Sequence, residues 1–319
     1  MSDTKAGNTV LLMGPTASGK SRLAMALAAR FPLEIISVDS AQVYRGMDIG
    51  TAKPDARELA EVPHHLIDII DPTEAYSAAR FREDALRLIG EIHARQRIAV
   101  LVGGTMLYFK ALRDGLSNLP AADPVIREDI NAEAAQRGWP ALHSDLSTID
   151  PVAAARIKIG DTQRIQRALE IYRITGTSLS NLIGEARDID TPFRALSIAL
   201  MPADRTHLHL DIADRMKRML RAGLLEELRA LRERFPLEAR MPAMRCVGYR
   251  QAWEHLDGKL SLGEMLERAT IATRQLAKRQ LTWLRATPDL HPLDCADTAQ
   301  TGKAIALIAA HTGVTATEG

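Results

Sequence analysis

The chain has 319 residues, of which 46% are hydrophobic and 25% are charged, a composition that fits one large or two ordinary globular domains and excludes wholesale disorder and collagen-like structure. The formal net charge of +1 does not by itself indicate a polyanionic partner. The two cysteines stand alone in the sequence, so we exclude a disulfide scaffold and a CxxC zinc site. No apolar run is long enough to span a membrane, and residues 1–9 lack the hydrophobic stretch of a signal peptide. We therefore expect a cytoplasmic protein with no membrane partner.

Strands and helices are predicted to alternate at the start of the chain. Three short apolar runs have the pattern of buried strands, and two segments between them have helical spacing. The strands are Thr9–Met13, Glu34–Val38 and Arg97–Val102, and the helices are Ser21–Arg30 and Ser77–Arg95. This alternation predicts an α/β fold, a P-loop-type parallel sheet with helices on both faces.

Ligands of such sheets bind beyond the carboxyl ends of the strands. The Gly-rich turn after Met13, the acidic residue Asp39 and the turn Gly103-Gly104-Thr105 all follow predicted strands. We therefore expect three loops to converge on one site.

The pattern changes to helical segments from residue 119 onward. Helices are predicted at about residues 124–136, 139–147, 151–157, 161–175 and 178–185. They indicate an inserted all-helical domain over residues 119–194, so that residues 1–118 and 195–319 form the P-loop-type core with the C-terminal helices. The core regains a strand at Arg194–Met201 and is predicted to continue as helices at residues 204–233, 248–256 and 261–286. After Pro288 only Lys303–His311 is patterned, as a peripheral helix.

The first loop fits the GxxxxGK[ST] pattern of a phosphate-binding loop, with the required strand before it and helix after it. Backbone N–H groups of such a loop surround phosphate oxygens, Lys20 reaches the terminal phosphates, and the Ser21 hydroxyl can ligate Mg²⁺. The residues expected to bind phosphate are Gly14, Pro15, Thr16, Ala17, Ser18, Gly19, Lys20 and Ser21. The loop indicates a nucleotide or a diphosphate without choosing between them, and a structural glycine turn is the alternative.

Asp39 allows three interpretations. It could hold Mg²⁺ through water, as carboxylates do in phosphoryl transfer, accept a proton from an acceptor amine as a general base, or cap a turn. Thr105 would bring a hydroxyl into the same crevice, although the two glycines before it can equally make a tight turn. His64 and His65 have no third metal ligand at a recognisable spacing, so we expect ordinary packing or substrate contacts there.

Basic charge is concentrated in the second half of the chain. Residues 1–150 carry 16 basic and 20 acidic side chains, whereas residues 151–319 carry 25 and 20. Gln163, Arg164 and Arg167 share a helix face that could reach base edges and phosphates, with a solvated helix face as the alternative. Residues 240–285 interleave basic side chains with tyrosine and tryptophan, the combination that binds single-stranded nucleic acid, although tryptophans more often anchor a core.

Together these residues resemble the family of tRNA dimethylallyltransferases, also called tRNA isopentenyltransferases, in its shorter bacterial form. The likeness rests on the phosphate loop and on five more specific runs. These runs are residues 39–54 (DSAQVYRGMDIGTAKP), 102–105, 163–170, 245–250 and 273–280. The resemblance implies transfer of a dimethylallyl group from dimethylallyl diphosphate to N6 of the adenosine immediately 3′ of the tRNA anticodon, with release of diphosphate.

The resemblance also implies roles for single residues. Lys20, Thr16 and Arg215 would neutralise the leaving diphosphate, together with Mg²⁺ on Ser21. Asp39 would accept the N6 proton and Thr105 would hydrogen-bond the same amine. Contact with tRNA is implied for Asp39, Ser40, Ala41, Gln42, Thr105, Arg127, Gln163, Arg164, Ile165, Gln166, Arg167, Arg245, Cys246, Val247, Gly248, Tyr249 and Arg250. The expected partners are a tRNA anticodon stem-loop and dimethylallyl diphosphate, and we expect a monomer.

Two other functions remain open from the sequence. A P-loop kinase or NTPase would bind ATP, use Asp39 to hold Mg²⁺ and use the insertion as a lid. A non-catalytic RNA-binding protein would account for the basic half of the chain but not for the phosphate loop.

Overall fold

The computed structural model describes residues 8–117, 119–183 and 193–317. It divides into two compact units, one made of Met1–Arg113 and Thr191–Gly319 and the other of Asp114–Asp190. Within the described residues, no helix is both long enough and apolar enough to cross a membrane. The inserted domain that the sequence predicts over residues 119–194 has similar bounds to the second unit, and its exact limits stay a prediction.

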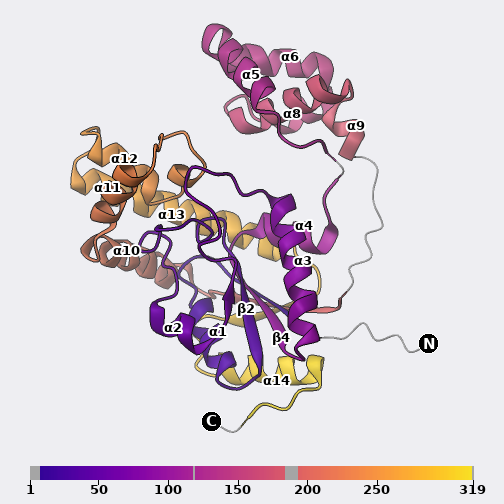
Figure 1. The fold of residues 1–319 in the computed structure, drawn as a ribbon, viewed down its shortest axis with the longest axis vertical. Helices are drawn as coiled ribbons and strands as arrows, with labels where there is room; N and C mark the ends of the chain where they lie inside the picture. Colours follow the sequence, from indigo (N-terminus) through magenta and orange to yellow (C-terminus); the bar gives the residue numbers. More distant parts are fainter. Residues whose placement is uncertain (1–7, 118, 184–192, 318–319) are drawn as a thin grey trace. The chain divides into compact units, whose positions relative to one another are not determined.

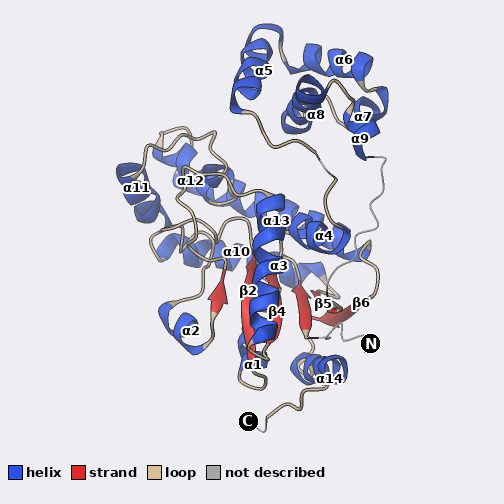
Figure 2. Cartoon of the chain, turned by 45° about the vertical axis from the view of Figure 1, so that its right-hand side comes forward, coloured by secondary structure: helices blue, strands red, loops and turns tan. Residues whose placement is uncertain are grey.

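The first unit is built on a six-stranded sheet in which every neighbouring pair is parallel (Figures 1 and 2). The spatial order is β3-β2-β4-β1-β5-β6. The strands are β1 (Thr9–Met13), β2 (Leu33–Val38), β3 (His64–His65), β4 (Ile98–Gly103), β5 (Ala195–Met201) and β6 (Leu290–Asp294). The predicted parallel α/β fold is therefore confirmed.

Helices cover both faces because successive strand side chains point to opposite sides of the sheet. Val10 and Leu12 of β1 belong to the core that packs against α1 (Lys20–Ala28) and α14 (Gln300–Thr312). Leu11 and Met13 belong to the other core, which includes the buried side of α3 (Ala78–Ala94). Burial on both faces explains why these strands are almost continuously apolar in sequence.

The core on the α3 face extends into a layer of helices that follows β5. These helices are α10 (Arg205–Arg221), α11 (Leu224–Arg234), α12 (Tyr249–Leu256) and α13 (Leu262–Arg285), and a 3₁₀ turn, η1 (Ala243–Arg245), precedes α12. The single helix predicted over residues 204–233 is wrong, because Gly223 adopts φ +104° and separates α10 from α11. Only glycine enters this region of backbone space at little cost, so the chain turns there.

Four short elements were not apparent from the sequence pattern. They are α2 (Ala56–Glu61), α4 (Met106–Asp114), β3 and β6. The sequence predicted no strand or helix between Pro288 and Lys303, but β6 lies there and pairs with β5 over Ser197↔Leu290 to Met201↔Asp294. β6 is an edge strand, where the missing N–H of Pro292 is tolerated.

The described residues of the second unit form helices and connecting turns, with a core of their own. Its helices are α5 (Pro124–Arg137), α6 (Trp139–Ile149), α7 (Pro151–Arg156), α8 (Thr162–Thr175) and α9 (Leu179–Ile183). Asp123, Asp150 and Asp161 cap α5, α7 and α8 by accepting hydrogen bonds from first-turn N–H groups. Ile130, Leu142, Leu146 and Ile165 are completely buried between the helices. The helix predicted at residues 178–185 corresponds to α9, and residues 184 and 185 of that prediction lie outside the described residues.

Candidate active site

The phosphate loop connects β1 to α1, so its backbone lies at the positive end of the helix. Lys20, the first residue of α1, folds back over the loop, and its Nζ donates to the carbonyl of Pro15 at 3.2 Å. Burial and the nearby Arg215 lower the pKa of Lys20 to about 8, while Asp39 opposes the shift. The structure thus brings together the loop lysine, Arg215 and Asp39, which lie far apart in sequence.

The loop contains a buried polar atom for which the described residues provide no partner. This atom is Oγ of Ser18. Leaving a buried hydroxyl unsatisfied costs about 1–3 kcal/mol, and a bound anion or ion would remove that cost. The loop therefore has the character of a site completed by its ligand.

The residues at the loop fit Mg²⁺ in one particular way. Ser21 lies exposed in the first turn of α1, and among the residues that the structure describes no three His, Cys, Asp or Glu side chains cluster to form a metal site. Mg²⁺ commonly keeps several waters and binds one or two protein groups plus substrate phosphates. Ser21 can provide such a ligand, with phosphate oxygens and water supplying the rest.

Asp39 and Thr105 follow two strands that pair directly, β2 and β4. The Thr105 N–H donates to the Val38 carbonyl at 3.1 Å, and its Oγ1 accepts from the Ser40 N–H at 3.1 Å. Asp39 Oδ1 accepts from the Ala41 N–H at 2.9 Å. Asp39 therefore does cap its turn, and because a carboxylate has two oxygens this bond is compatible with a second role.

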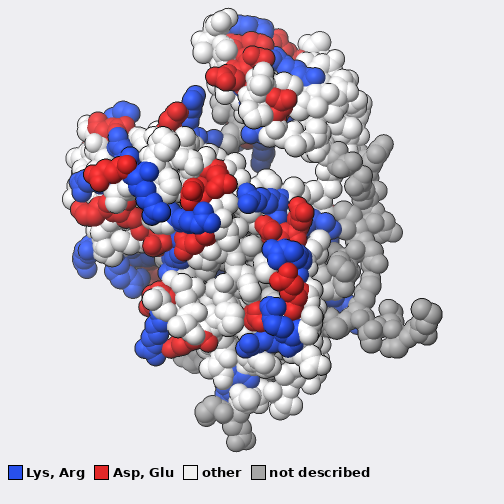
Figure 3. Space-filling view, viewed as in Figure 1, with Lys and Arg blue, Asp and Glu red and all other residues white. Residues whose placement is uncertain are grey.

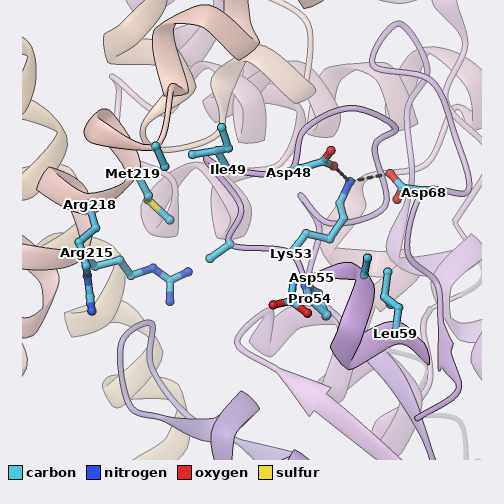
Figure 4. Close-up of a pocket in the computed structure, with 13 residues that line it drawn as sticks. Asp48, Ile49, Lys53, Pro54, Asp55, Leu59, Asp68, Arg215, Arg218 and Met219 are labelled. Atoms are coloured by element: carbon cyan, nitrogen blue, oxygen red, sulfur yellow. Dashed lines mark hydrogen bonds and ion pairs between the residues drawn. The ribbon is translucent and has the colours of Figure 1, made fainter. Parts of the chain in front are cut away.

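A cavity of about 640 Å³ lies next to Arg215 (Figure 4). Arg215 extends into it from α10, while Lys53 on the other side turns toward Asp48 and Asp68, each 2.5 Å away (Figure 4). Burial lowers the pKa of Arg215, and Asp39 counteracts this effect. The cavity is lined by Asp48, Ile49, Ala52, Lys53, Pro54, Asp55, Ala56, Leu59, Asp68, Arg215, Arg218, Met219 and Ala222. With Lys53 held by two carboxylates, Arg215 and Arg218 are the basic side chains that remain for an anion.

Glu227 holds the loop of residues 48–52, which forms one wall of this cavity. Its carboxylate accepts from the N–H groups of Asp48 and Ile49 at 2.9 and 2.7 Å, and from the Tyr249 hydroxyl at 2.5 Å. Glu227 could not be selected from the sequence, because a lone glutamate on an amphipathic helix has no distinguishing pattern. Gln42 supports the same loop, since its Nε2 donates to the Ala52 carbonyl at 3.3 Å.

The structure separates the predicted tRNA contacts at residues 245–250 into exposed and buried groups. Arg245 and Arg250 are exposed, whereas Tyr249 is completely buried and bonded to Glu227. Burial, reinforced by Glu227, raises the pKa of Tyr249 far above its usual value. Burial also raises the pKa of the Cys246 thiol to about 12. A direct RNA contact by the Tyr249 side chain is therefore inconsistent with this conformation, because the ring has no accessible surface.

A buried carboxylate organises the arginines of the helical unit. Glu170 accepts from Arg127 Nε at 2.8 Å, from Arg167 Nη1 at 2.6 Å and from the Asp123 N–H at 2.8 Å. Burial of Glu170 opposes its ionisation, but these hydrogen bonds outweigh that effect and lower its pKa. Arg127 and Arg167, predicted separately to contact tRNA, are thus held side by side within this unit.

The other predicted contacts on α8 differ in exposure. Gln163 and Arg164 are exposed, and Gln166 is half-buried with its Nε2 donating to Asn131 Oδ1 at 2.8 Å. Ile165 is completely buried in the core of the helical unit. Contact between the Ile165 side chain and RNA is therefore inconsistent with the structure, since the residue faces inward at its helical position.

The histidine pair noted in the sequence has a structural explanation. His65 pairs with Glu34 at 2.7 Å, which agrees with ordinary packing.

Basic and acidic side chains alternate along α3 (Figure 3), and Arg87 of this helix pairs with Asp84 and Glu91. This surface has no uniform positive charge that would attract a polyanion.

Comparisons with known proteins agree over nearly the whole chain. Residues 42–287 match the family described as IPP transferase. The tRNA dimethylallyltransferase of Aromatoleum aromaticum is 61% identical over 292 residues, covering 90% of this chain and 91% of that protein. That of Nitrosomonas europaea is 54% identical over 308 residues, covering 97% of each.

Solved structures show the same similarity in three dimensions. The full-length tRNA isopentenylpyrophosphate transferase of Bacillus halodurans superimposes with a TM-score of 0.69 at 36% identity, covering 96% of this chain and 98% of that one. A eukaryotic dimethylallyltransferase acting on tRNA gives a TM-score of 0.75 at 28% identity, covering 94% of this chain and 78% of that one.

Proposed function

This chain belongs to the tRNA dimethylallyltransferase family, whose members prenylate a tRNA adenosine, and we propose that it transfers a dimethylallyl group from dimethylallyl diphosphate to N6 of the adenosine immediately 3′ of the anticodon. The observation that carries the detailed proposal is the meeting of Lys20, Arg215 and Asp39 beside the Thr105 turn. Cationic groups for a leaving diphosphate and a carboxylate for an acceptor proton are thereby present in one place.

The phosphate loop binds the diphosphate of the donor. Backbone N–H groups of the loop, the Thr16 hydroxyl and the Lys20 ammonium are the donors that the loop provides. Arg215 adds a second cation from α10. As the C1–O bond of the donor breaks, charge grows on the diphosphate, and fixed donors stabilise that charge without reorganising. Each charge-assisted hydrogen bond contributes about 1.5–3 kcal/mol.

Asp39 and Thr105 act on the acceptor. The Thr105 hydroxyl hydrogen-bonds N6 of adenine, and Asp39 accepts the N6 proton while nitrogen forms its bond to C1 of the dimethylallyl group. Their positions at adjacent strand ends support this assignment. The adenine must leave its stack to reach them, at a cost of a few kcal/mol that is smaller in a single-stranded loop than in a duplex.

Mg²⁺ is proposed as the cofactor, with the Ser21 hydroxyl as its protein ligand. When bound, it would neutralise part of the diphosphate charge. The exposed position of Ser21 and the unpartnered Ser18 hydroxyl support a site completed by substrate phosphates.

Exposed basic and amide side chains of both units are proposed to bind the anticodon stem-loop. Arg245 and Arg250 in the first unit and Gln163 and Arg164 in the second are accessible to RNA. Contacts by Ser40, Ala41, Gln42, Gln166, Val247 and Gly248 remain proposals, as does a monomeric enzyme.

The test uses radiolabelled dimethylallyl diphosphate, Mg²⁺ and an anticodon stem-loop with adenosine immediately 3′ of the anticodon. A second stem-loop differs only by guanosine at that position. We expect label on the first RNA and none on the second, because guanosine lacks the N6 amine. If both RNAs and full-length tRNA stay unlabelled while ATP is hydrolysed, the site is that of a P-loop NTPase and the proposal is wrong.

A further inference from the structure

One side chain from the C-terminal helix layer connects the phosphate loop with the turn that carries Thr105. Gln280 lies on α13 and is only 7% exposed. Its Oε1 accepts from the Thr16 N–H at 3.0 Å, and its Nε2 donates to the Gly104 carbonyl at 2.9 Å. Thr16 belongs to the proposed diphosphate site, and Gly104 directly precedes the residue proposed to hold the acceptor amine. A single amide therefore spans both halves of the reaction centre.

Both hydrogen bonds require an amide. The Thr16 N–H needs an acceptor and the Gly104 carbonyl needs a donor, so the orientation of the Gln280 amide is fixed by its partners. Glutamate would keep the acceptor but would place a second oxygen against the Gly104 carbonyl. Methionine would keep the length of the side chain and lose both bonds.

Gly104 provides the space that this arrangement needs. A Cβ at this position would lie 2.3 Å from Gln280 Nε2 and 3.2 Å from the Gly14 carbonyl oxygen. The glutamine amide is the end of a flexible side chain, so alanine at position 104 would displace the amide before it moved the strand. Glycine at position 104 is therefore needed for the close approach of the Gln280 amide as well as for the tight turn.

We propose that Gln280 is a positioning residue that fixes the separation between the bound diphosphate and the acceptor amine. Through Gly104 it restrains Thr105, which in turn bonds Val38 and Ser40 on either side of Asp39. A displacement of about 1 Å between reacting groups can lower a rate about 100-fold, because the two reactants must already be aligned when they meet. The inference rests on the proposed prenyl transfer and adds a residue that acts on its geometry.

The test compares Gln280→Met, Gly104→Ala and the double variant with the wild-type protein. Gln96→Met is the matched control, because Gln96 lies exposed in the turn before β4, at the end of the sheet opposite the site. Single-turnover transfer is measured at saturating dimethylallyl diphosphate and tRNA, together with both KM values, the affinity for pyrophosphate and the thermal unfolding midpoint.

We expect Gln280→Met to lower the transfer rate about 10- to 100-fold while both KM values and the pyrophosphate affinity change less than about 3-fold. Gly104→Ala should have a similar effect, and the double variant should be no slower than the slower single variant, because both changes remove the same bridge. Gln280→Glu, which keeps the bond from Thr16, should fall between Gln280→Met and wild type.

Three results would overturn the inference. They are a transfer rate in Gln280→Met equal to that of the Gln96→Met control, a loss of pyrophosphate affinity as large as the loss of rate, or fully additive effects in the double variant. If Gln280→Met does not fold, Gln280→Glu and Gly104→Ala give the same comparison. Absence of transfer by the wild-type protein would instead refute the proposed function.

Discussion

Asp39 and Thr105 in the α/β unit and Arg127 and Arg167 in the helical unit are two clusters whose side chains are positioned in different ways. Asp39 and Thr105 take their places from the backbone, because they follow paired strands and their turns are bonded to each other. Arg127 and Arg167 are both bonded to one side chain, the buried Glu170, and Arg167 also donates to the Pro120 carbonyl at 2.7 Å. The first arrangement follows from sheet topology, and the second is centred on one carboxylate.

This difference suggests that the two clusters can be damaged separately. Changes at the strand ends should lower the rate of transfer with little effect on RNA binding. Changes around Glu170 should weaken RNA binding with little effect on the diphosphate site. The following substitutions test that separation, beginning with the largest expected effect.

Asp39→Asn should lower the rate of transfer about 100- to 10,000-fold, because the amide cannot accept the N6 proton. The amide oxygen can still accept from the Ala41 N–H, so the turn should survive. Pyrophosphate binding in the presence of Mg²⁺ and tRNA binding, both measured by calorimetry, should change little. Transfer at the wild-type rate would remove the general-base role, and a loss of Mg²⁺-dependent pyrophosphate binding would favour a metal-holding role.

Raising the pH should weaken pyrophosphate binding through Lys20. Its pKa of about 8 in the free protein means that the ammonium loses its proton as the pH rises above 8. An anion favours the charged form, so binding above that pH must take up a proton, and the affinity should fall by up to about 10-fold per pH unit.

Lys20→Arg is the control for this pH effect, because arginine stays charged over the whole range. It also corrects for the ionisation of pyrophosphate itself. We expect the ratio of wild-type to variant Kd to be constant between pH 6.5 and 7.5 and to increase above pH 8. A ratio that does not change with pH would contradict the assignment, and tRNA binding should not follow this profile.

Glu170→Gln should raise the KM for tRNA about 5- to 10-fold, because Arg127 and Arg167 lose the carboxylate that holds them together. Leaving these donors poorly paired should also destabilise the helical unit by about 1–3 kcal/mol, measurable by denaturant unfolding. Glu133→Gln is the matched control. Glu133 also pairs with an arginine of this unit, Arg173, but on the surface, where such pairs contribute about 1 kcal/mol or less. A KM change of equal size in both variants would show that Glu170 has no special role.

Much of the fold could be predicted because its signals are local in the sequence. Buried strands are short apolar runs, and the phosphate loop is a contiguous motif between β1 and α1. β3 has two residues, and β6 exposes His291 and Pro292, so neither has a strand pattern. The alternation of strands and helices was enough to place Asp39 and Thr105 together without them.

The supporting side chains could not be predicted, because each acts across a long sequence distance. Gln280 is 264 residues from Thr16, and Glu227 is 179 residues from Asp48. No sequence periodicity connects such pairs. Both side chains lie on amphipathic helices, where the spacing of apolar residues indicates which positions are buried but not which residues they bond. The same is true of Tyr249 and Ile165, where membership of a basic or polar run suggested RNA contact but the side chain is needed in the core.

Arg164→Ala should have the smallest effect and should separate the two kinds of arginine in the helical unit. Arg164 is 71% exposed and pairs with Asp161 at 3.4 Å, whereas Arg167 is held by Glu170. A phosphate contact of this kind is worth about a 2- to 5-fold change in tRNA affinity, and its loss should reduce the slope of log K against log salt by about 0.7–1. We expect Arg167→Ala to cost more at every salt concentration, because it also leaves Glu170 without one of its partners. If the two substitutions have equal effects and equal slopes, Glu170 adds nothing to RNA binding and the contrast between the two units fails at this point.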